Sequence, residues 1–232
     1  MRDERILREL ELAEVVRLYR AGALPAVAAD AEPAARIEAA AAPALDVSAL
    51  DWDGLREAVR DCRLCGLCAR RRQAVLGVGG ARAQWLFVGE GPGADEDAQG
   101  EPFVGQAGKL LDGMLAAIGL ERGEAVYIAN VVKCRPPGNR TPTLEEAKAC
   151  APFLDRQIEL IQPKLIVALG KTAASRLLGT DASLASLRRK VHRYQGIPVV
   201  VTYHPAYLLR ELPEKAKAWE DLLFARRTLR ES

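Results

Sequence analysis

Residues 88–108, with the sequence VGEGPGADEDAQGEPFVGQAG, decide the predicted fold class and the place of the site. The apolar run before them, Trp85-Leu86-Phe87-Val88, ends abruptly in Gly89-Glu90-Gly91-Pro92-Gly93. Strand-forming residues followed by glycine and proline predict a buried strand that leaves a sheet. Glycines let the backbone approach a ligand closely, and open α/β sheets bind ligands at the C-terminal ends of their strands. The segment therefore predicts a ligand-binding loop that includes Gly89 and Gly91.

This loop does not match the two common phosphate-binding patterns. It lacks the Lys-Ser/Thr ending of a nucleotide P-loop and the GxGxxG spacing of a dinucleotide site. Three acids, Asp95, Glu96 and Asp97, follow the glycines and argue against a simple phosphate cradle. Taken alone, the loop is as compatible with a structural turn as with a binding site.

The composition is that of an ordinary globular protein. The chain has 232 residues, enough for one substantial domain with an appendage, and its net charge of +2 does not by itself indicate nucleic-acid binding. Two local basic runs, residues 70–72 and 188–190, fit phosphate contacts and solvated faces equally well.

The sequence contains no stretch long and apolar enough to span a membrane, and its charged start, MRDERILREL, lacks the apolar core of a signal peptide. We therefore expect a cytoplasmic protein without membrane association. In that compartment the five cysteines favour metal ligands or free thiols over disulfides.

The first 47 residues differ in composition from the rest. Apolar side chains spaced along residues 3–20 predict a short amphipathic helix, which can dock on the core or on a partner. Residues 21–47 are alanine-rich with three prolines and predict a linker. We expect a boundary between this extension, residues 1–47, and one domain at 48–232.

Strands alternate with helices along the remaining chain. Further strands are expected at 126–132, 164–170 and 197–202, and helices at 107–119, 144–161, 172–178 and 213–229. Ser48 or Asp51 can cap a helix through Arg60, and Thr143 with Glu146 has the spacing of a capping box. Residues 180–196 are expected to be a polar connection. This order predicts an α/β fold with a parallel sheet and helices on both faces.

Four of the five cysteines form an economical metal-ligand set: Cys62, Cys65, Cys134 and Cys150. Four cysteines suit either zinc or an iron–sulfur cluster, and the spacing alone does not choose between them. Cys68 continues the CxxC spacing and is left out of this ligand set. The alternative to a metal site is that the cysteines are scattered buried thiols.

Three separated motifs, GEGPGADEDAQGEPFVGQAGKLL, NVVKCRPPGNRTP and TYHPAYLLR, resemble those of the family 4 uracil-DNA glycosylases, the iron–sulfur branch of their superfamily. The CxxCxL segment at residues 62–67 fits the same family, and the resemblance covers about residues 55–212. It implies a four-stranded parallel sheet between helices and a [4Fe–4S] cluster on Cys62, Cys65, Cys134 and Cys150. It also implies removal of uracil from DNA, which starts base-excision repair. We expect a monomer that acts on single- or double-stranded DNA. The N-terminal helix, which lies outside the resemblance, is the expected contact for a repair or replication partner.

The resemblance also implies roles for three residues of the pocket. Phe103 would stack on the uracil ring that has left the base stack. The amide of Asn130 would read the uracil edge, since it both donates and accepts hydrogen bonds. His204 would donate a hydrogen bond to uracil O2 as charge builds there. Without the motifs, each would be taken as structural; the second histidine, His192, matches no catalytic motif.

Water activation and DNA contacts are less directly assigned. The best-known uracil glycosylases have an Asp where Gly91 stands, so Glu90 is the first candidate to position water and Glu96 the second. The segment from Pro205 is expected at the minor groove, with Leu208 or Leu209 as a wedge and Arg210 on phosphate. Basic residues near the cluster, Lys133, Arg135 and Arg140, are expected along the phosphate backbone.

Two other functions remain open at this point. A uracil-DNA binding or crosslinking module without turnover is the main alternative, and the related branch of that kind has a basic, His-containing insertion after the second strand. Here that position holds CRPPGNRTP, without histidine. A redox or zinc-linked nucleotide-binding protein would leave HPAYLL unexplained. Turnover on uracil-containing DNA separates the three.

Overall fold

The computed structural model describes residues 46–123 and 125–231. The predicted N-terminal helix and nearly all of the predicted linker lie outside the described residues. Val47, which the sequence assigned to the linker, is 4% exposed and belongs to the main hydrophobic core. The folded domain therefore includes Val47, one residue before the predicted boundary at 48.

The domain is built on a six-stranded sheet in the order β1-β3-β2-β4-β6-β5. The strands are β1 (Val78–Gly79), β2 (Trp85–Gly89), β3 (Val126–Asn130), β4 (Leu165–Leu169), β5 (His192–Tyr194) and β6 (Ile197–Thr202). The central four, β3, β2, β4 and β6, are parallel, whereas β1 and β5 pair antiparallel at the two edges. The expected four-stranded parallel sheet is thus the centre of a larger mixed sheet. Both edge strands were missed because they are short and lack an alternating apolar pattern.

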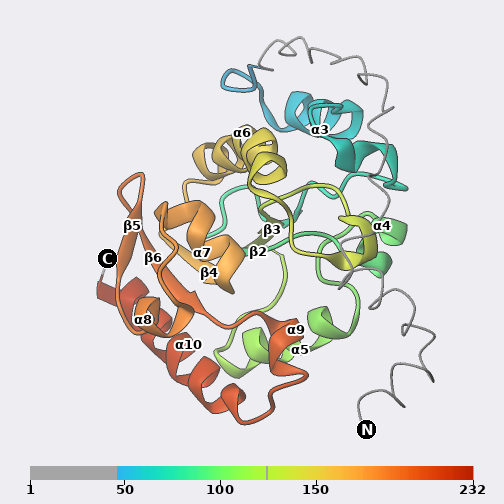
Figure 1. The fold of residues 1–232 in the computed structure, drawn as a ribbon. Helices are drawn as coiled ribbons and strands as arrows, with labels where there is room; N and C mark the ends of the chain where they lie inside the picture. The colour runs from blue at the N-terminus through green and yellow to red at the C-terminus, as the bar shows by residue number, and fades with distance from the viewer. Residues whose placement is uncertain (1–45, 124, 232) are drawn as a thin grey trace, which may run out of the picture. The chain divides into compact units, whose positions relative to one another are not determined.

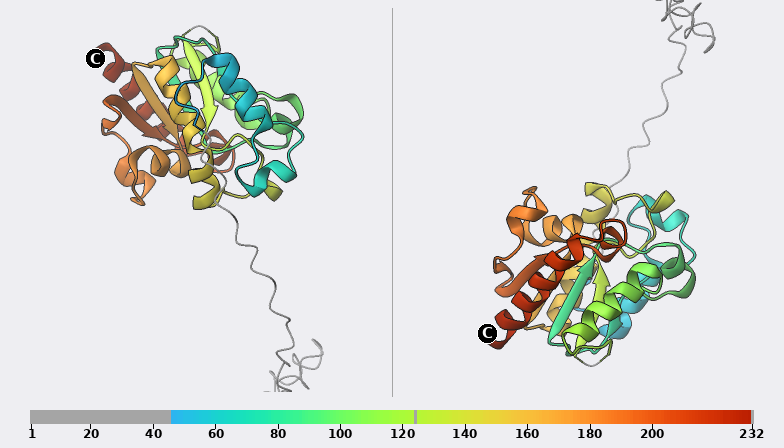
Figure 2. Two further views of the ribbon diagram at one scale, coloured as in Figure 1. Left: turned by 90° about the horizontal axis from the view of Figure 1, so that it is seen from above. Right: turned by 90° about the horizontal axis from the view of Figure 1, so that it is seen from below.

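Helices cover both faces of this sheet, as predicted (Figure 1). The helices α3 (Trp52–Asp61), α6 (Leu144–Ile161) and α7 (Lys171–Leu178) contribute to one hydrophobic core, and α5 (Gln106–Ala117) and α10 (Glu214–Glu231) to the other. The right-hand view of Figure 2 shows the second face, crossed by α5 and α10. Strand β2 is buried on both sides: Leu86 and Val88 face the first core, and Trp85 and Phe87 face the second. This two-sided burial explains its continuous apolar run.

Short elements occupy the connections. They are η1 (Gly66–Ala69), α4 (Ala94–Gln99), η2 (Pro137–Asn139), α8 (Leu184–Leu187) and α9 (Pro205–Leu208). Helix α4 contains the acids that the sequence analysis placed in a loop. The positive end of the helix dipole stabilises acidic side chains in the first turn of a helix, and this interaction favours the short helix α4.

Two capping predictions can be checked directly. Helix α6 begins after Thr143, whose hydroxyl accepts from the Glu146 N–H at 3.2 Å while the Glu146 carboxylate accepts from the Thr143 N–H at 2.8 Å. The capping box and the predicted bounds of α6 are confirmed. For α3 the cap is Asp51 rather than Ser48, since Oδ1 of Asp51 accepts from the Gly54 N–H at 2.9 Å.

Candidate functional site

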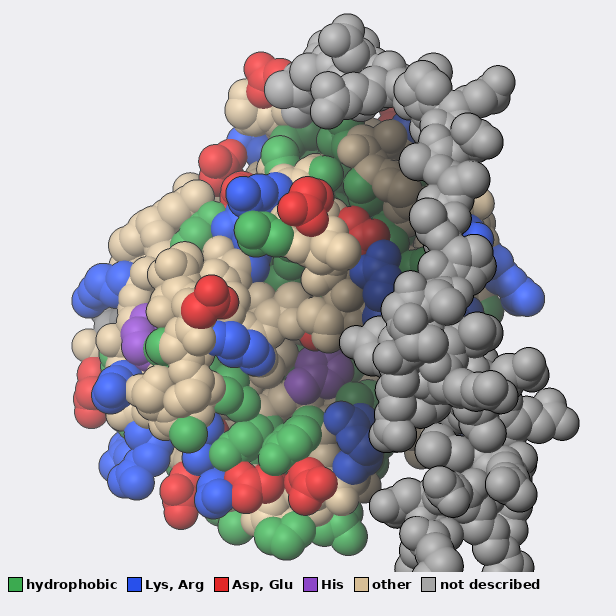
Figure 3. All heavy atoms as spheres, viewed as in Figure 1, with side chains coloured by type: hydrophobic (Ala, Val, Ile, Leu, Met, Phe, Trp, Pro, Cys, Tyr) green, Lys and Arg blue, Asp and Glu red, His purple; other side chains and the backbone are tan. Residues whose placement is uncertain are grey.

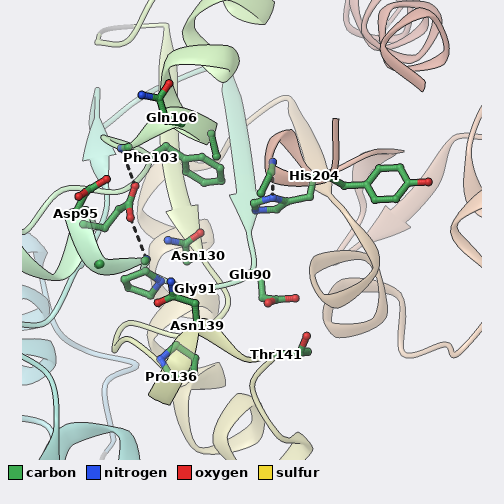
Figure 4. Close-up of a pocket in the computed structure, with 18 of the residues that line it drawn as sticks. Glu90, Gly91, Asp95, Phe103, Gln106, Asn130, Pro136, Asn139, Thr141 and His204 are labelled. Carbon is green, nitrogen blue, oxygen red and sulfur yellow. Dashed lines mark hydrogen bonds between the residues drawn. The ribbon is translucent and has the colours of Figure 1, made fainter. Parts of the chain in front are cut away.

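A cavity of about 530 Å³ opens where the parallel strands β2, β3 and β6 end. Figure 3, drawn from the same side as Figure 1, shows a hollow on this face with a histidine side chain in it and basic side chains nearby. Most of the predicted site residues border the cavity: Glu90, Gly91, Glu96, Phe103, Asn130, His204 and Arg210. Figure 4 shows how the side chains of Glu90, Phe103, Asn130 and His204 surround it. The topology therefore brings together segments more than 100 residues apart.

Phe103 is held in an unusual backbone conformation. Its φ is +56°, in the left-handed region that is costly for a bulky residue, and the residue is 5% exposed. Arg122 donates to the carbonyl oxygens of Pro102, at 2.9 Å, and of Phe103. Gly108 permits this packing because a Cβ there would collide with the Phe103 carbonyl. The surrounding chain thus fixes the Phe103 ring 5.4 Å, centroid to centroid, from the His204 ring.

Asn130 ends β3 directly beside Gly89 of β2. A Cβ at Gly89 would collide with Oδ1 of Asn130 and lie 2.5 Å from Cζ of Phe103. Gly89 does not border the cavity itself, so its contribution is the space that lets these two side chains meet. Asn130 is 2% exposed, and its Oδ1 is buried without a hydrogen-bond partner in the described part of the chain. A buried polar atom of this kind is costly unless a ligand pairs with it.

His204 precedes helix α9, and its orientation is set by a backbone contact. Its Nδ1 accepts from the Ala206 N–H at 3.1 Å, so the neutral ring carries its proton on Nε2. Burial, reinforced by the nearby Arg210 charge and opposed by Glu96, lowers the pKa of His204 to about 4. The ring is therefore a neutral hydrogen-bond donor around pH 7.

The two candidate carboxylates have different environments. Glu96 is 9% exposed; one oxygen accepts from the Gly93 N–H at 3.0 Å and the other from the N–H groups of Val104 and Gly105 at 2.9 and 3.0 Å. Glu96 therefore ties the two ends of the loop together, which the sequence analysis did not foresee.

Glu90 is less constrained than Glu96. One of its oxygens accepts from the hydroxyl of Thr172 in α7, and the side chain borders the cavity. This hydrogen bond joins the loop after β2 to the helix after β4. Of the two carboxylates, Glu90 has the capacity to accept a further hydrogen bond from a ligand or water.

The expectation for Leu208 needs correction. Leu208 is 1% exposed and packs with Tyr203 and Ala218, so it cannot act as a wedge without leaving its core. Its neighbour Leu209, the other candidate, is 41% exposed. Arg210 borders the cavity, and its Nη1 donates to the Ala206 carbonyl at 2.9 Å.

Lys133 is also placed differently from the prediction of a phosphate contact. It is 1% exposed, and its Nζ donates to the Asn130 carbonyl at 2.9 Å and to Oε1 of Gln157 at 2.5 Å. Burial lowers its pKa to about 8. Lys133 thus stabilises the C-terminal end of β3 from inside the fold and is not available to DNA. Arg140, in contrast, borders the cavity and pairs with Glu146 at 2.7 Å.

All five cysteines line a second, small cavity between α3, η1 and α6, and all are free thiols. Each member of the predicted ligand set accepts an N–H. Cys62 accepts from Leu64 at 3.5 Å, Cys134 from Nη1 of Arg71 at 2.8 Å and Cys150 from Lys133 at 3.2 Å, while the Leu67 N–H hydrogen-bonds Cys65. Such donors stabilise thiolate sulfur, as expected around metal ligands.

The chemistry of this cysteine cavity suits a metal cofactor with thiolate ligands. Burial is the main cause that raises the pKa of Cys65, Cys134 and Cys150, so thiolates at these positions need a compensating cation. Within residues 46–123 and 125–231, no three ligand-type side chains converge closely enough to hold one metal ion. A cluster of several irons does not require such convergence, because each thiolate binds a different iron.

Three functional positions were not found from the sequence: Gly108, Arg122 and Thr172. Arg122 follows α5 without any motif, and Thr172 is an ordinary first-turn helix residue. Only the packing of α5 and α7 against the loops after β2 gives them a role.

In the described ranges, no helix is of a length and hydropathy to cross a membrane.

Comparisons with known proteins agree with this arrangement. The family model described as the uracil DNA glycosylase superfamily matches residues 76–223. A type-4 uracil-DNA glycosylase of Thermotoga maritima is 50% identical over 156 residues, which is 66% of this chain and 81% of that protein. A type-4 enzyme of Pyrobaculum aerophilum is 42% identical over 181 residues, 75% of this chain and 92% of that protein. A type-5 uracil-DNA glycosylase of Thermus thermophilus is 29% identical over 177 residues, 63% of this chain and 78% of that protein.

Proposed function

The chain belongs to the uracil DNA glycosylase superfamily, and we propose that it hydrolyses the bond between uracil and deoxyribose in DNA, leaving an abasic site. The resemblance drawn from the three motifs is thereby confirmed. The observation that carries the proposal is the convergence of Phe103, Asn130 and His204 on one cavity, where Oδ1 of Asn130 is buried and has no partner among the residues that the structure describes.

The cavity has the parts needed to bind a uracil ring outside the base stack. Extrusion costs a few kcal/mol, which binding in the pocket must offset. The ring of Phe103 offers a stacking face. The carboxamide of Asn130 matches uracil, whose N3–H donates to Oδ1 and whose O4 accepts from Nδ2. Cytosine presents an acceptor at N3 and a donor at N4, so an amide held in this orientation discriminates against it.

His204 would act on the charge that develops as the bond breaks. When N1 of uracil leaves C1′ of the sugar, the electron pair of that bond spreads onto uracil O2. The neutral ring of His204 would donate its Nε2–H to O2, and its position is already fixed by the Ala206 N–H, so no reorganisation is needed. A neutral donor also avoids burying a cation beside the apolar face of Phe103.

Glu90 would position the water that attacks C1′. Gly91 cannot act as a base, and Glu96 is occupied by three backbone N–H groups. Thr172 fixes one oxygen of Glu90, and the second is left to accept from water. The carboxylate charge would also stabilise a sugar with oxocarbenium character.

The rim of the cavity would hold the DNA. Leu209, exposed at 41%, is the proposed wedge that fills the gap left by the extruded nucleotide, and Arg210 is the proposed phosphate contact. Together they support a minor-groove contact by the segment directly after His204.

We further propose that Cys62, Cys65, Cys134 and Cys150 hold a [4Fe–4S] cluster with a structural role. When bound, the cluster would cross-link the segment before β2, the loop after β3 and helix α6. The N–H donors to these four sulfurs support this set, and within the described ranges no such contact is recorded for Cys68.

Iron content tests this ligand set. Protein purified without oxygen should contain about four irons per chain and absorb in the visible range. Cys134→Ala should lose iron or solubility, whereas Cys68→Ala, the matched control, should keep both. Loss of iron in Cys68→Ala with retention in Cys65→Ala would instead assign Cys68 as a ligand.

Excision from uracil-containing oligonucleotides tests the function. We expect multiple turnovers to abasic product; one covalent complex per protein chain would favour the crosslinking alternative, and no reaction would refute both. Asn130→Asp should slow uracil excision because its carboxylate faces uracil O4, and should permit slow cytosine excision because cytosine offers a donor at N4. Unchanged uracil excision in Asn130→Ala would remove Asn130 from the proposed site.

A further inference from the structure

A second large cavity lies beside helix α3 and away from the proposed active site. Its volume is about 870 Å³, and five arginines line it together with the aromatic residues Trp52 and Tyr127: Arg56, Arg60, Arg63, Arg71 and Arg72. Among the described residues, none that lines it is an Asp or Glu. We call this feature the arginine groove. It includes Arg71 and Arg72 of the basic run at 70–72, and neither has a role in the proposed mechanism.

Most of these cations remain available to a ligand. Arg63 and Arg72 are exposed, and their side chains have no hydrogen bond or ion pair recorded with any described residue. Arg56 and Arg60 pair with Asp53 and Asp61 on the open surface, where such pairs contribute little.

Arg71 is the exception within the arginine groove. Its guanidinium donates to the Cys134 sulfur at 2.8 Å and to two backbone carbonyls. Arg71 therefore anchors the groove to the cysteine cavity, and the other four arginines supply the accessible charge.

The cations come from separate segments, namely α3, the residues just after it and the loop after η1. Arg56 and Arg60 are spaced by four residues in α3, which places them on one side of that helix, and Arg63 follows just after the helix ends. Arg72 lines the groove from the loop after η1. Cations spread over separate segments match several successive phosphates better than they match one free phosphate ion.

Helix α4 connects the arginine groove to the active site. Gly93, which caps its N-terminus, borders the catalytic cavity, and Gly100, which caps its C-terminus, lines the groove. Six helical residues span about 9 Å. The Arg72 N–H donates to Asp97 at 2.9 Å and Nε2 of Gln73 to the Ala98 carbonyl at 2.8 Å, so the loop that carries Arg72 is fixed to this helix.

We propose that the arginine groove binds backbone phosphates of the uracil-bearing strand a few nucleotides away from the extruded base. At 3.4 Å of rise per nucleotide, the length of α4 corresponds to about three nucleotides. Trp52 and Tyr127, whose rings lie 5.4 Å apart, add an apolar wall against which a base or sugar can pack. The proposal rests on the proposed function, since it extends the DNA surface of that same site.

Binding measurements with DNA of two lengths test the groove. The variant is Arg63→Gln/Arg72→Gln, and the probes are a labelled 20-nucleotide single strand with a central uracil and a trinucleotide with the same uracil. Affinity for the 20-mer should fall about tenfold, and its dependence on salt should weaken by about one to two released ions. Affinity for the trinucleotide, too short to reach the groove, should stay unchanged. Arg230→Gln, an exposed arginine of α10, is the matched control and should leave both affinities unchanged.

Two results would overturn the groove: unchanged affinity and salt dependence for the 20-mer, or equal weakening for both lengths. Iron content and thermal unfolding of the variant confirm that the fold is intact. Because the readout is binding, a wild-type protein that binds both probes but does not excise uracil would refute the proposed function while the length comparison still decides the groove.

Discussion

The catalytic cavity and the cysteine cavity differ in whether their polar atoms already have hydrogen-bond partners. In the catalytic cavity, the buried Oδ1 of Asn130 has no partner within the described residues, and the His204 ring keeps its Nε2–H for a ligand. In the cysteine cavity, each sulfur of the predicted ligand set already accepts an N–H. The catalytic cavity therefore has a donor and an acceptor available for a substrate that binds and dissociates. The cysteine cavity suits the permanently bound cluster that we propose.

The two cavities also differ in how their residues are held. Phe103 keeps a left-handed backbone because Arg122, Gly108 and Glu96 fix the loop around it. Backbone strain of this kind costs of order 1–3 kcal/mol and persists only where the surroundings impose it. The cysteines have no positive φ: Cys62, Cys65 and Cys134 lie at helix ends or in loops, and Cys150 lies inside α6. Changes in the catalytic cavity should therefore affect chemistry before stability.

The largest expected effect is that of His204→Ala on excision. We expect the single-turnover rate on uracil-containing DNA to fall roughly 10²–10³-fold, the scale of one lost oxyanion donor. Binding of the same DNA should change little, because charge on O2 appears only as the bond breaks. Rapid-quench kinetics and fluorescence anisotropy measure the two quantities.

His192→Ala provides the control for that experiment. His192 lies in β5, and its Nε2 contacts the Leu187 carbonyl at 2.8 Å, far from the proposed chemistry. Its excision rate should match the wild type. A His204→Ala protein that loses affinity but keeps its excision rate would contradict the assignment.

Gly89→Ala should have the next largest effect. The added methyl group meets Oδ1 of Asn130 and the Phe103 ring, so the two side chains can no longer converge. Misplacement of groups by about 1 Å can reduce rates by up to about 10²-fold, and we expect a loss of roughly 10- to 100-fold in single-turnover excision.

Gly113→Ala is the matched control for Gly89→Ala. Gly113 lies in α5, and a Cβ there meets nothing within 4 Å. Alanine should stabilise this helix by about 0.5–1 kcal/mol without changing excision. Normal excision in Gly89→Ala would show that the pocket tolerates a shift of Asn130 and Phe103.

A smaller effect concerns pH. The pKa of His204 in the fold is about 4, below the value near 6.5 expected for an unfolded histidine. Between these values the unfolded chain binds a proton that the fold does not, so the contribution of His204 to stability falls as pH drops from about 6.5 to 4. NMR titration of the His204 ring should give a midpoint near 4; a midpoint near 6.5 would mean that the ring is not buried as described.

The smallest expected effect is that of removing residues 1–45. This segment contains no motif of the proposed site, and the deletion keeps Val47 in the core. Iron content, thermal unfolding and excision from short oligonucleotides should be nearly unchanged. A folded deletion protein with its iron but without excision would show that the extension belongs to the active site.

Much of the fold was predictable because its signals are local. The apolar strands, the capping box at Thr143 and the bounds of α6 follow from periodicity and turn chemistry. The edge strands β1 and β5 and helix α4 escaped because two- to six-residue elements carry too little pattern, and their pairing with neighbours decides them.

The sequence by itself determined the α/β class, the family and the residue types of the catalytic cavity, because motifs such as NVVKCRPPGNRTP and TYHPAYLLR lie at predicted strand ends. Only the tertiary structure decided what each residue does there. It buried Leu208 and Lys133, engaged Glu96 with backbone N–H groups and left Oδ1 of Asn130 without a partner among the described residues. Exposure and hydrogen-bond partners depend on which distant segments pack together, and that information is not contained in any single stretch of the chain.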